Sequence, residues 1–475
     1  MRRLRLASLA LLALLLIGTR PASADWAHDP YSPLPLCAYN TSAQNLQASL
    51  PDGSGGMYAL FADYRFSNWD LYMTHILSTG AQDPAWPLNG LAVCGATGDQ
   101  QNAKMVLDGL GGVWVAWEDL RSGSSKVYVS HVNANGTLQA GIPTNGLQID
   151  PASSAAQTAP DLTVSNGALC IAWQYAYSVS DNDIYAAVVG TNNAITWVLR
   201  VANSSVNQTM PKVVISGESG AFVISYYETV SNVITQKFAF LNPLNASTVY
   251  PVLTGYTNMP GATPILLKLD GIGFEMMNMY PNIAVNLVSA GTMGPGMSLV
   301  NSGTFGMVGL YPRAGNTLWA VWADWANNIV NLVPFSPGNP VPVTPIALSN
   351  LSNAFGTSDG QGGVLIEANS QPNLSIVATR VLANGVVPPL FNVSYGGPVI
   401  AYPTPYLGGF TPLNALMPPA SDGKGGMYAF GWNSRLPNGN YNWGVLEGLL
   451  AVDGVRVKLE HGGSAVVNLK VAVPR

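Results

Sequence analysis

The sequence predicts an all-β fold, a β-propeller built from four-stranded antiparallel blades. Two observations carry this prediction. A glycine-rich turn followed by a short apolar strand recurs along the chain about every 50 residues, a spacing typical of propeller blades. After residues 6–18 no sustained helical periodicity follows, and 34 prolines and 50 glycines interrupt most windows in which a helix could form.

Residues 108–121 are the clearest copy of the repeated unit, with the sequence Asp-Gly-Leu-Gly-Gly-Val-Trp-Val-Ala-Trp-Glu-Asp-Leu-Arg. Its aspartate and glycines tolerate positive φ, which a tight hairpin turn requires. Residues 113–117 are β-branched, aromatic or small, as in a buried strand. Charge returns at Glu118, where we expect the strand to leave the core.

Eight turn anchors of this kind divide the chain, and they predict eight blades. Four anchors keep the motif Asp-Gly-x-Gly-Gly, and we interpret their aspartates as structural turn residues: Asp52, Asp108, Asp359 and Asp422. The other four anchors are degenerate and lie at Asn166-Gly167, Gly217 to Gly220, Asp270-Gly271 and Ala314-Gly315. Because the fifth and sixth units are the weakest, seven blades remain the alternative.

The unit around Asp108 shows the expected internal plan of a blade. Its four strands are predicted at 101–107, 113–117, 126–132 and from 147 onwards. Later units keep the second and third strands, at 168–173 and 183–189, 221–226 and 233–240, 273–277 and 283–288, 318–322 and 329–333, 364–366 and 374–381, and 427–430 and 441–450. The proline-rich segment 398–419 is predicted to be a long insertion between the last two units.

The two ends of the chain predict export and closure of the ring. Residues 1–24 combine three early arginines, an apolar run and the cleavage pattern Ala-Ser-Ala, which is typical of a signal peptide. We therefore expect a signal peptide at 1–24, a propeller at 25–450 and a C-terminal β-hairpin at 451–475 that closes or caps the propeller. Residues 34–39 resemble the fourth strand of a unit, so they are a second candidate for the closing strand.

Composition limits the partners of the chain. Loss of residues 1–24 removes four of the 20 Lys and Arg and none of the 25 Asp and Glu, which leaves a net charge of about −9. This balance argues against nucleic acid or an anionic membrane as a partner. The apolar run of the signal is about 13 residues, too short for a membrane span. We expect a secreted, extracellular or periplasmic protein with no membrane span after signal cleavage.

Three cysteines, Cys37, Cys94 and Cys170, leave at least one thiol outside any internal disulfide. Cys37 and Cys94 follow similar residues, Leu-Pro-Leu and Leu-Ala-Val, and so occupy matching positions in neighbouring units. A disulfide between them is possible if their strands adjoin. The pattern favours two buried small apolar residues.

Polar residues that recur at matching positions of the repeated unit favour structural roles over catalytic ones. Asp63-x-Arg65 and Asp119-x-Arg121 follow second strands, and we interpret them as local ion pairs instead of a charged ring. His75 and His131 also match in position, but no third ligand with suitable spacing accompanies them, so we predict no metal and no cofactor. One carboxylate per glycine-rich turn is poor coordination for calcium, which supports a turn-forming role alone.

Six tryptophans near loops or strand ends are the best candidate binding residues. Exposed aromatic side chains on a surface with few charges suit stacking on sugars or contact with apolar partners. The alternative for each is packing between blades. The six are Trp69, Trp86, Trp197, Trp325, Trp432 and Trp443.

The units at 52–65, 108–121 and 422–435 resemble the Asp-Gly-x-Gly-Gly repeats of secreted bacterial β-propellers. The segment Trp-Pro-Leu-Asn-Gly at 86–90 resembles the stretch that follows such units. The resemblance is good over 30–190, patchy over 200–350, and returns at 355–450. It implies a propeller and export, and it implies no activity.

The sialidase-like propellers are a more distant likeness. Their repeated box, Ser/Thr-x-Asp-x-Gly-x-x-Trp, is not met at 421–425, where the aspartate comes one residue early. Sialidases also need three arginines and a Tyr/Glu pair around the axis. Arg65, Arg121 and Arg435 instead repeat at one position of the unit, which favours a role in fixing loops.

The sequence favours a non-catalytic, exported propeller that binds a protein or glycan partner through one face. Nucleophile and zinc signatures such as Gly-x-Ser-x-Gly and His-Glu-x-x-His are absent. Two alternatives stay open: a glycan-active enzyme of sialidase-like build, and a structural component of the cell surface. Neither the ligand nor the oligomeric state follows from the sequence.

Overall fold

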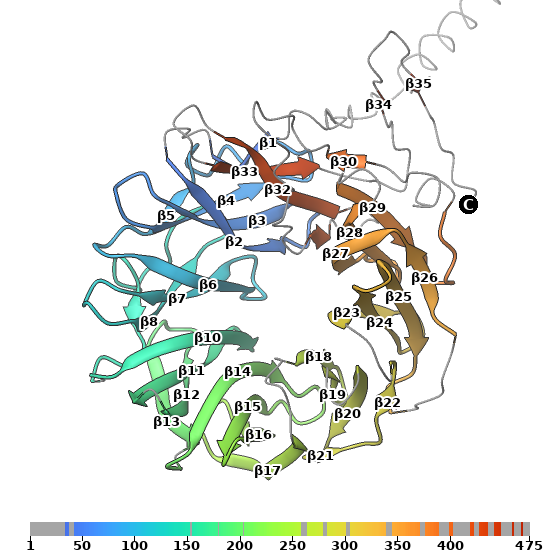
Figure 1. Ribbon diagram of the computed structural model, residues 1–475. Coiled ribbons are helices and arrows are strands. Elements are labelled where there is room, and N and C mark those ends of the chain that lie inside the picture. Colours follow the sequence, from blue (N-terminus) through green and yellow to red (C-terminus); the bar gives the residue numbers. More distant parts are fainter. Residues whose placement is uncertain are drawn as a thin grey trace, which may run out of the picture.

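The computed structural model describes residues 34–37, 42–152, 154–178, 180–202, 204–257, 264–278, 283–300, 305–338, 344–370, 376–388, 399–401, 419–421, 427–435, 441–447, 458–459 and 467–468. The predicted signal peptide, the turn at Asp422 and nearly all of the proline-rich insertion lie outside these residues. Over the described residues the chain forms eight sheets of four or five strands arranged around one axis (Figure 1). The predicted all-β propeller of antiparallel blades is confirmed.

Seven sheets consist of consecutive strands, and we number them as blades 1 to 7. Blade 1 contains β2 (Gln44–Pro51), β3 (Met57–Asp63), β4 (Asp70–Ile76) and β5 (Leu91–Cys94). Blade 2 contains β6 (Gln100–Leu107), β7 (Val113–Asp119), β8 (Lys126–Val132) and β9 (Leu147–Gln148). Blade 3 contains β10 (Ala156–Ser165), β11 (Ala168–Ser178), β12 (Asp181–Val189) and β13 (Ile195–Ala202). Blade 4 contains β14 (Asn207–Ile215), β15 (Phe222–Val230), β16 (Val233–Leu241) and β17 (Thr248–Thr257).

Blade 5 has an additional short strand and contains β18 (Ile265–Leu269), β19 (Gly273–Asn278), β20 (Ala284–Ser289), β21 (Thr292–Met293) and β22 (Met297–Ser298). Blade 6 contains β23 (Phe305–Arg313), β24 (Thr317–Asp324), β25 (Ile329–Phe335) and β26 (Ile346–Ser349). Blade 7 contains β27 (Leu351–Ser358), β28 (Val364–Ser370), β29 (Ile376–Val381) and β30 (Val399–Ala401).

The eighth sheet is composite and joins the two ends of the propeller. It combines β31 (Ala420–Ser421), β32 (Met427–Arg435) and β33 (Tyr441–Glu447) with β1 (Leu34–Pro35), and Leu34 pairs with Val445. The segment predicted at 34–39 therefore supplies the closing strand. The C-terminal strands β34 (Lys458–Leu459) and β35 (Val467–Asn468) pair with each other, and a capping role for this hairpin stays a prediction.

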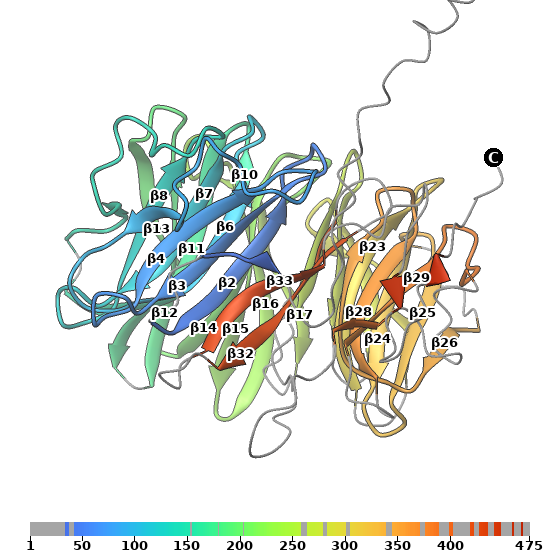
Figure 2. The same cartoon turned by 90° about the horizontal axis from the view of Figure 1, so that it is seen from above.

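The first strand of each blade lies nearest the axis, and first strands of neighbouring blades contact one another around the ring (Figure 1). Seen from above, the strands run between the two faces of the ring (Figure 2). One face carries the turns between first and second strands, and we call it the turn face. The apolar clusters lie between adjacent blades, so blades 2 to 6 are packed on both sides. No helix in the described part of the chain is long and apolar enough to span a membrane.

Aspartates fix the turns as the repeated motif predicts. The Asp108 Oδ1 atom accepts hydrogen bonds from the backbone N–H groups of Leu110 at 2.6 Å and Gly112 at 2.9 Å. Asp52 and Asp359 accept the equivalent bonds in blades 1 and 7. These bonds satisfy turn donors that face no strand partner.

Replacement of Gly112 by alanine is expected to lower the free energy of unfolding by about 3 kcal/mol, because the added Cβ has no room. It would lie 2.7 Å from the Val132 carbonyl oxygen and 2.5 Å from the Asp108 Oδ2 atom. The matched control is Gly109→Ala in the same turn, where φ is +81° but no atom lies within 4 Å. That variant should lose only about 1 kcal/mol, from backbone strain. Urea denaturation of both variants measures the difference, and equal losses would contradict the steric explanation.

Candidate functional site

His75 and His131, which occupy matching positions in third strands, contact the aspartates of the glycine-rich turns. The His131 Nε2 atom lies 2.9 Å from Asp108 Oδ2, and the His75 Nε2 atom lies 3.0 Å from Asp52 Oδ2. In blade 7 the same position holds Arg380, which donates to Asp359 Oδ2 from Nε at 3.0 Å. In each of these three turns, a side chain of the third strand thus contacts the Oδ2 atom of the aspartate. No group of three or more potential metal ligands occurs among the described residues.

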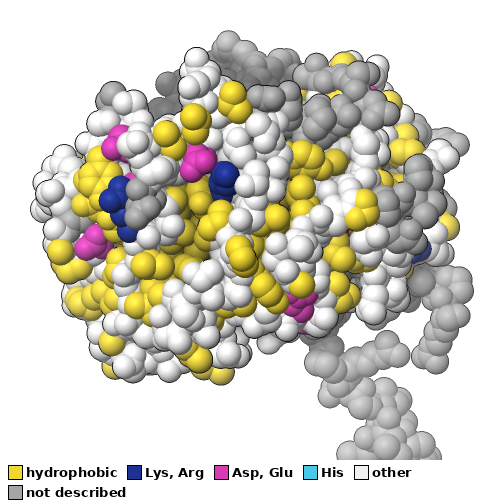
Figure 3. Space-filling view, turned by 90° about the horizontal axis from the view of Figure 1, so that it is seen from below, with side chains coloured by type: hydrophobic (Ala, Val, Ile, Leu, Met, Phe, Trp, Pro, Cys, Tyr) yellow, Lys and Arg dark blue, Asp and Glu magenta, His cyan; other side chains and the backbone are white. Residues whose placement is uncertain are grey.

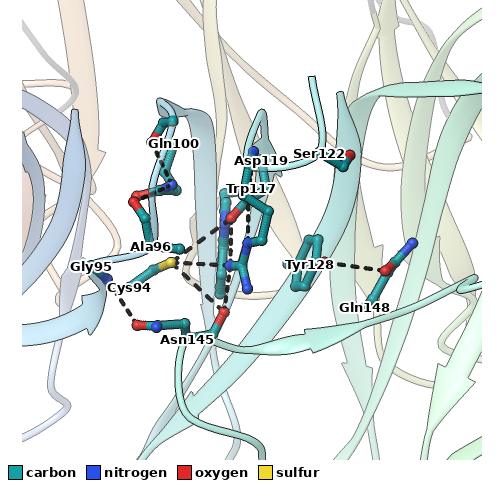
Figure 4. Close-up of polar contacts among 12 residues, drawn as sticks. Cys94, Gly95, Ala96, Gln100, Trp117, Asp119, Ser122, Tyr128, Asn145 and Gln148 are labelled. Carbon is teal, nitrogen blue, oxygen red and sulfur yellow. Dashed lines mark hydrogen bonds and ion pairs between the residues drawn. The ribbon is translucent and has the colours of Figure 1, made fainter. Parts of the chain in front are cut away.

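The Asp-x-Arg pairs form polar clusters between blades, as their predicted role as local ion pairs suggests. Asp119 is fully buried and accepts hydrogen bonds from Arg121 Nε at 2.8 Å and Trp117 Nε1 at 2.8 Å. The Arg121 guanidinium also donates to the Asn145 carbonyl oxygen at 2.7 Å and contacts Cys94 Sγ at 3.3 Å. Figure 4 shows Cys94, Asp119 and Asn145 gathered in this cluster. Because Cys94 ends the last strand of blade 1, this cluster joins blade 1 to blade 2.

The same arrangement joins the ends of the ring. Arg65 forms an ion pair with buried Asp63 at 2.8 Å, donates to the Asn89 carbonyl oxygen at 3.1 Å and contacts Cys37 Sγ at 3.4 Å. Cys37 follows the closing strand β1, so this second cluster spans the seam. No disulfide joins Cys37 to Cys94, and each buried thiol belongs to its own cluster. We call these two assemblies the arginine clusters.

Two of the six predicted binding tryptophans link blades. Trp86 is buried, and its Nε1 atom donates to the Ala134 carbonyl oxygen of blade 2 at 3.2 Å. Trp197 is half-buried in β13, and its Nε1 atom donates to the Pro243 carbonyl oxygen of blade 4 at 2.9 Å. For this pair, packing between blades accounts for the side chain.

The other four differ in exposure. Trp69 is half-buried, with its ring 5.3 Å from that of Tyr64. Trp325 follows β24 and is 50% exposed. Trp432 and Trp443 lie opposite each other in β32 and β33, and their side chains are outside the described part of the structure. Trp325 therefore has the exposure that a binding residue needs.

Exposed aromatic side chains of the described residues share one face of the ring. Tyr64 and Phe66 lie in the loop after β3, Tyr177 is at the end of β11, and Trp325 follows β24. All four adjoin a connection between the second and third strands of a blade, opposite the turn face. We call this side the aromatic face. Composition did not distinguish Tyr64, Phe66 and Tyr177 as candidates, because their exposure depends on where each second strand ends.

Blade 3 brings three tyrosine rings together on the aromatic face. Tyr175 stacks on Tyr185 with ring centroids 4.7 Å apart, and it lies 4.7 Å from the ring of Tyr177. The hydroxyls of Tyr177 and Tyr185 are 2.8 Å apart. The Arg200 guanidinium lies 5.1 Å from the Tyr177 ring and forms an ion pair with buried Asp183. We call these five residues the tyrosine cluster.

An ion pair and protonated tyrosine hydroxyls make up the polar part of the tyrosine cluster. Burial raises the pKa of Tyr185, and its hydrogen bond with Tyr177 raises that pKa further, so the hydroxyl remains protonated at neutral pH. Burial also raises the pKa of Asp183, while the positive charge of Arg200 opposes this shift. The cluster offers hydroxyl and guanidinium donors beside an aromatic surface.

A groove of about 470 Å³ opens on the turn face between blades 3 and 4. None of its lining residues is charged, and Val188, Pro243 and Leu244 give it apolar walls. Its polar side chains are Ser165, Asn166, Thr191, Thr196, Ser219 and Asn242. Trp197 adjoins the groove through its bond to Pro243.

Glu275 is a buried carboxyl whose pKa is displaced toward neutrality. It is 1% exposed, and burial raises its pKa to about 8. It faces a water-sized pocket between blades 5 and 6, lined by Val285, Met297, Phe335 and Gly338. The pocket is too small for an organic ligand, so the buried carboxyl of Glu275 affects stability and not ligand binding.

Comparison with known proteins identifies no family for the chain. No family model matches the chain, and no curated protein sequence matches it. A puromycin-hydrolyzing peptidase of Mycobacterium tuberculosis matches with 11% identity and a TM-score of 0.45, over 76% of this chain and 56% of the peptidase. The chain thus spans little more than half of that protein.

Two further solved structures are also distant matches. The polysaccharide lyase Uly1 matches with 9% identity and a TM-score of 0.42, over 74% of this chain and 91% of the lyase. The sialidase Hz136, described as a Hadza microbial enzyme, matches with 9% identity and a TM-score of 0.35, over 67% and 65%. Similarity at this level concerns the propeller architecture and transfers no activity.

Proposed function

We propose that the chain is an exported binding module that recognises a glycan through its aromatic face. The observation that carries this proposal is the position of Tyr64, Phe66, Tyr177 and Trp325, which are 42–67% exposed on the same side of the ring. Sugar rings stack on such side chains because their axial C–H groups present an apolar surface to the aromatic ring. A scattered set of exposed aromatics would not support this function.

The charge of the surface supports a neutral ligand or a ligand with few charges. Charged residues make up 9% of the chain, and the side of the molecule in Figure 3 shows few charged side chains among hydrophobic and uncharged polar ones. Such a surface gives little electrostatic attraction to nucleic acid or anionic lipid. Export, which residues 1–24 suggest, would bring the module to extracellular or periplasmic glycans.

Binding of oligosaccharides to the secreted chain tests this proposal. We expect dissociation constants in the micromolar to millimolar range on a glycan panel, measured by titration calorimetry. Phe66→Ala and Trp325→Ala should each weaken binding of a long oligosaccharide about three- to tenfold, through loss of one stacking contact. The control is Leu110→Ala on the turn face, where the side chain is 84% exposed. Absence of binding across the panel, or equal losses in the control, would overturn the proposal.

A further inference from the structure

We infer that the tyrosine cluster of blade 3 is a subsite for one neutral pyranose ring, stacked on Tyr177 and hydrogen-bonded by Arg200. This inference rests on the proposed function and names the residues and sugar class at one point of the aromatic face. It is independent of the tryptophans that the sequence singled out.

The strand registers show that blade 3 has exchanged the arginine cluster for tyrosines. Trp117 pairs with Tyr128 in blade 2, and Trp173 pairs with Tyr185 in blade 3. Trp173 is therefore equivalent to Trp117. Two residues further along, Tyr175 takes the place of Asp119, and four residues further along, Tyr177 takes the place of Arg121. The side chains that lock blade 2 to its neighbour are replaced by aromatic ones.

The charged pair of blade 3 comes from other strands. Lys126 pairs with Asp119 in blade 2, whereas Asp183 pairs with Tyr175 in blade 3. Arg200 lies opposite Tyr185 on the outermost strand, where blade 2 has Gln148 opposite Tyr128. Blade 3 thus keeps an aspartate, an arginine and a tyrosine near one another, but with the arginine on the outer edge of the sheet.

This rearrangement exposes the groups that the arginine clusters bury. The Arg65 and Arg121 side chains are 8% and 22% exposed, because each reaches across to a cysteine and a carbonyl of its surroundings. The Arg200 side chain is 39% exposed, and Tyr177 is 47% exposed. Blade 3 therefore presents an aromatic ring and guanidinium donors to solvent where two other blades use them for packing.

The chemistry of the cluster selects a neutral sugar. Asp183 compensates the charge of Arg200, so an anionic sugar gains little attraction there. The exposed Tyr177 ring offers a stacking surface, and its hydroxyl and the guanidinium offer donors for vicinal sugar hydroxyls. A side chain held by an ion pair and a ring contact loses little conformational entropy on binding.

The test uses the full secreted chain and short oligosaccharides that fill one subsite. The probes are di- and trisaccharides of glucose, galactose, mannose and xylose, with a uronate-containing disaccharide as the acidic probe. We expect Tyr177→Ala to weaken binding of a neutral probe about tenfold and Arg200→Lys about threefold. Leu244→Ala, 79% exposed on the turn face, should change binding less than twofold. Tyr177→Phe separates the ring from its hydroxyl and should retain most of the affinity.

The outcomes separate this inference from the proposed function. If no oligosaccharide binds the wild-type chain, both fail. If oligosaccharides bind and Phe66→Ala or Trp325→Ala weakens binding while Tyr177→Ala and Arg200→Lys do not, the aromatic face survives and the blade 3 subsite is overturned. A preference for the acidic probe that depends on Arg200 overturns the neutral-sugar assignment. Thermal unfolding of each variant confirms that the fold is intact.

Discussion

Replacement of Glu275 by glutamine is expected to stabilise the protein by about 5 kcal/mol at pH 9 and to leave its stability nearly unchanged at pH 4. The carboxyl is 1% exposed in the gap between blades 5 and 6, and burial raises its pKa from 4.5 to about 8. A shift of one pKa unit corresponds to about 1.4 kcal/mol, so the full shift corresponds to about 5 kcal/mol. Glutamine is nearly isosteric and carries no charge at any of these pH values.

The direction of the pH dependence follows from which state releases its proton first. Below pH 4.5 the Glu275 carboxyl is protonated in both the folded and the unfolded chain, and it contributes no penalty. Between pH 4.5 and about 8 the unfolded chain ionises while the folded chain keeps its proton, so the free energy of unfolding falls as pH rises. Above about pH 8 the penalty is complete.

Urea denaturation of the wild-type and Glu275→Gln chains at pH 4, 6 and 9 measures this effect. The difference between the two stabilities should be near zero at pH 4 and should grow with pH. The control is Asp270→Asn in the same blade, whose side chain is 89% exposed and paired with Lys268. Parallel stability curves for wild type and Glu275→Gln would show that the carboxyl is solvated in the folded protein.

The position of Glu275 explains why its burial could not be predicted from the sequence. It is the third residue of β19, as Trp319 is the third residue of β24. Trp319 fills the space between blades 6 and 7 and donates to the Gly362 carbonyl oxygen at 3.0 Å. The Glu275 side chain is smaller than that of a tryptophan and does not fill the equivalent space between blades 5 and 6, where the water-sized pocket lies. The sequence does not reveal the burial of Glu275, because the residues that bury it, such as Phe335, lie in the next blade.

The turns and strands could be predicted because they depend on local chemistry. The predicted third strand at 126–132 coincides with β8, and the predicted turn at Gly217 to Gly220 lies between β14 and β15. The closing strand was predictable because Cys37 and Cys94 follow similar residues. These features follow from glycine backbone freedom, aspartate hydrogen bonds and β-branched side chains within a few residues of each other.

The binding candidates were harder to predict, because exposure depends on contacts between blades. Trp86 and Trp197 lie near strand ends, as an exposed aromatic would, but each bonds a carbonyl of the next blade. Tyr177 lies in a strand, as a core residue would, yet it is 47% exposed. Its significance follows only when the register places it at the position of Arg121. The periodicity of the sequence predicts where the strands lie, but it does not predict which residues of different blades occupy equivalent positions.

Replacement of Arg121 by alanine is expected to lower the free energy of unfolding by about 3 kcal/mol, because it leaves a buried carboxylate without its charged partner. Asp119 is fully buried, and its ion pair with Arg121 has an N–O distance of 2.6 Å. The same arginine stacks on Tyr128 at 4.0 Å and contacts Cys94 Sγ of blade 1 at 3.3 Å, so its removal also weakens the contact between blades 1 and 2.

Arg121→Lys is the matched variant for this contact. Lysine keeps the charge but cannot donate to Asp119, Cys94 and Asn145 from one planar group, so we expect an intermediate loss of about 1–2 kcal/mol. Arg65→Ala makes the equivalent change at the seam, where the arginine contacts Cys37 beside the closing strand. Because that contact joins the two ends of the ring, Arg65→Ala should also speed proteolysis of the N-terminal segment, and Arg121→Ala should not. Equal proteolysis rates in the two variants would show that β1 pairing alone holds the seam closed.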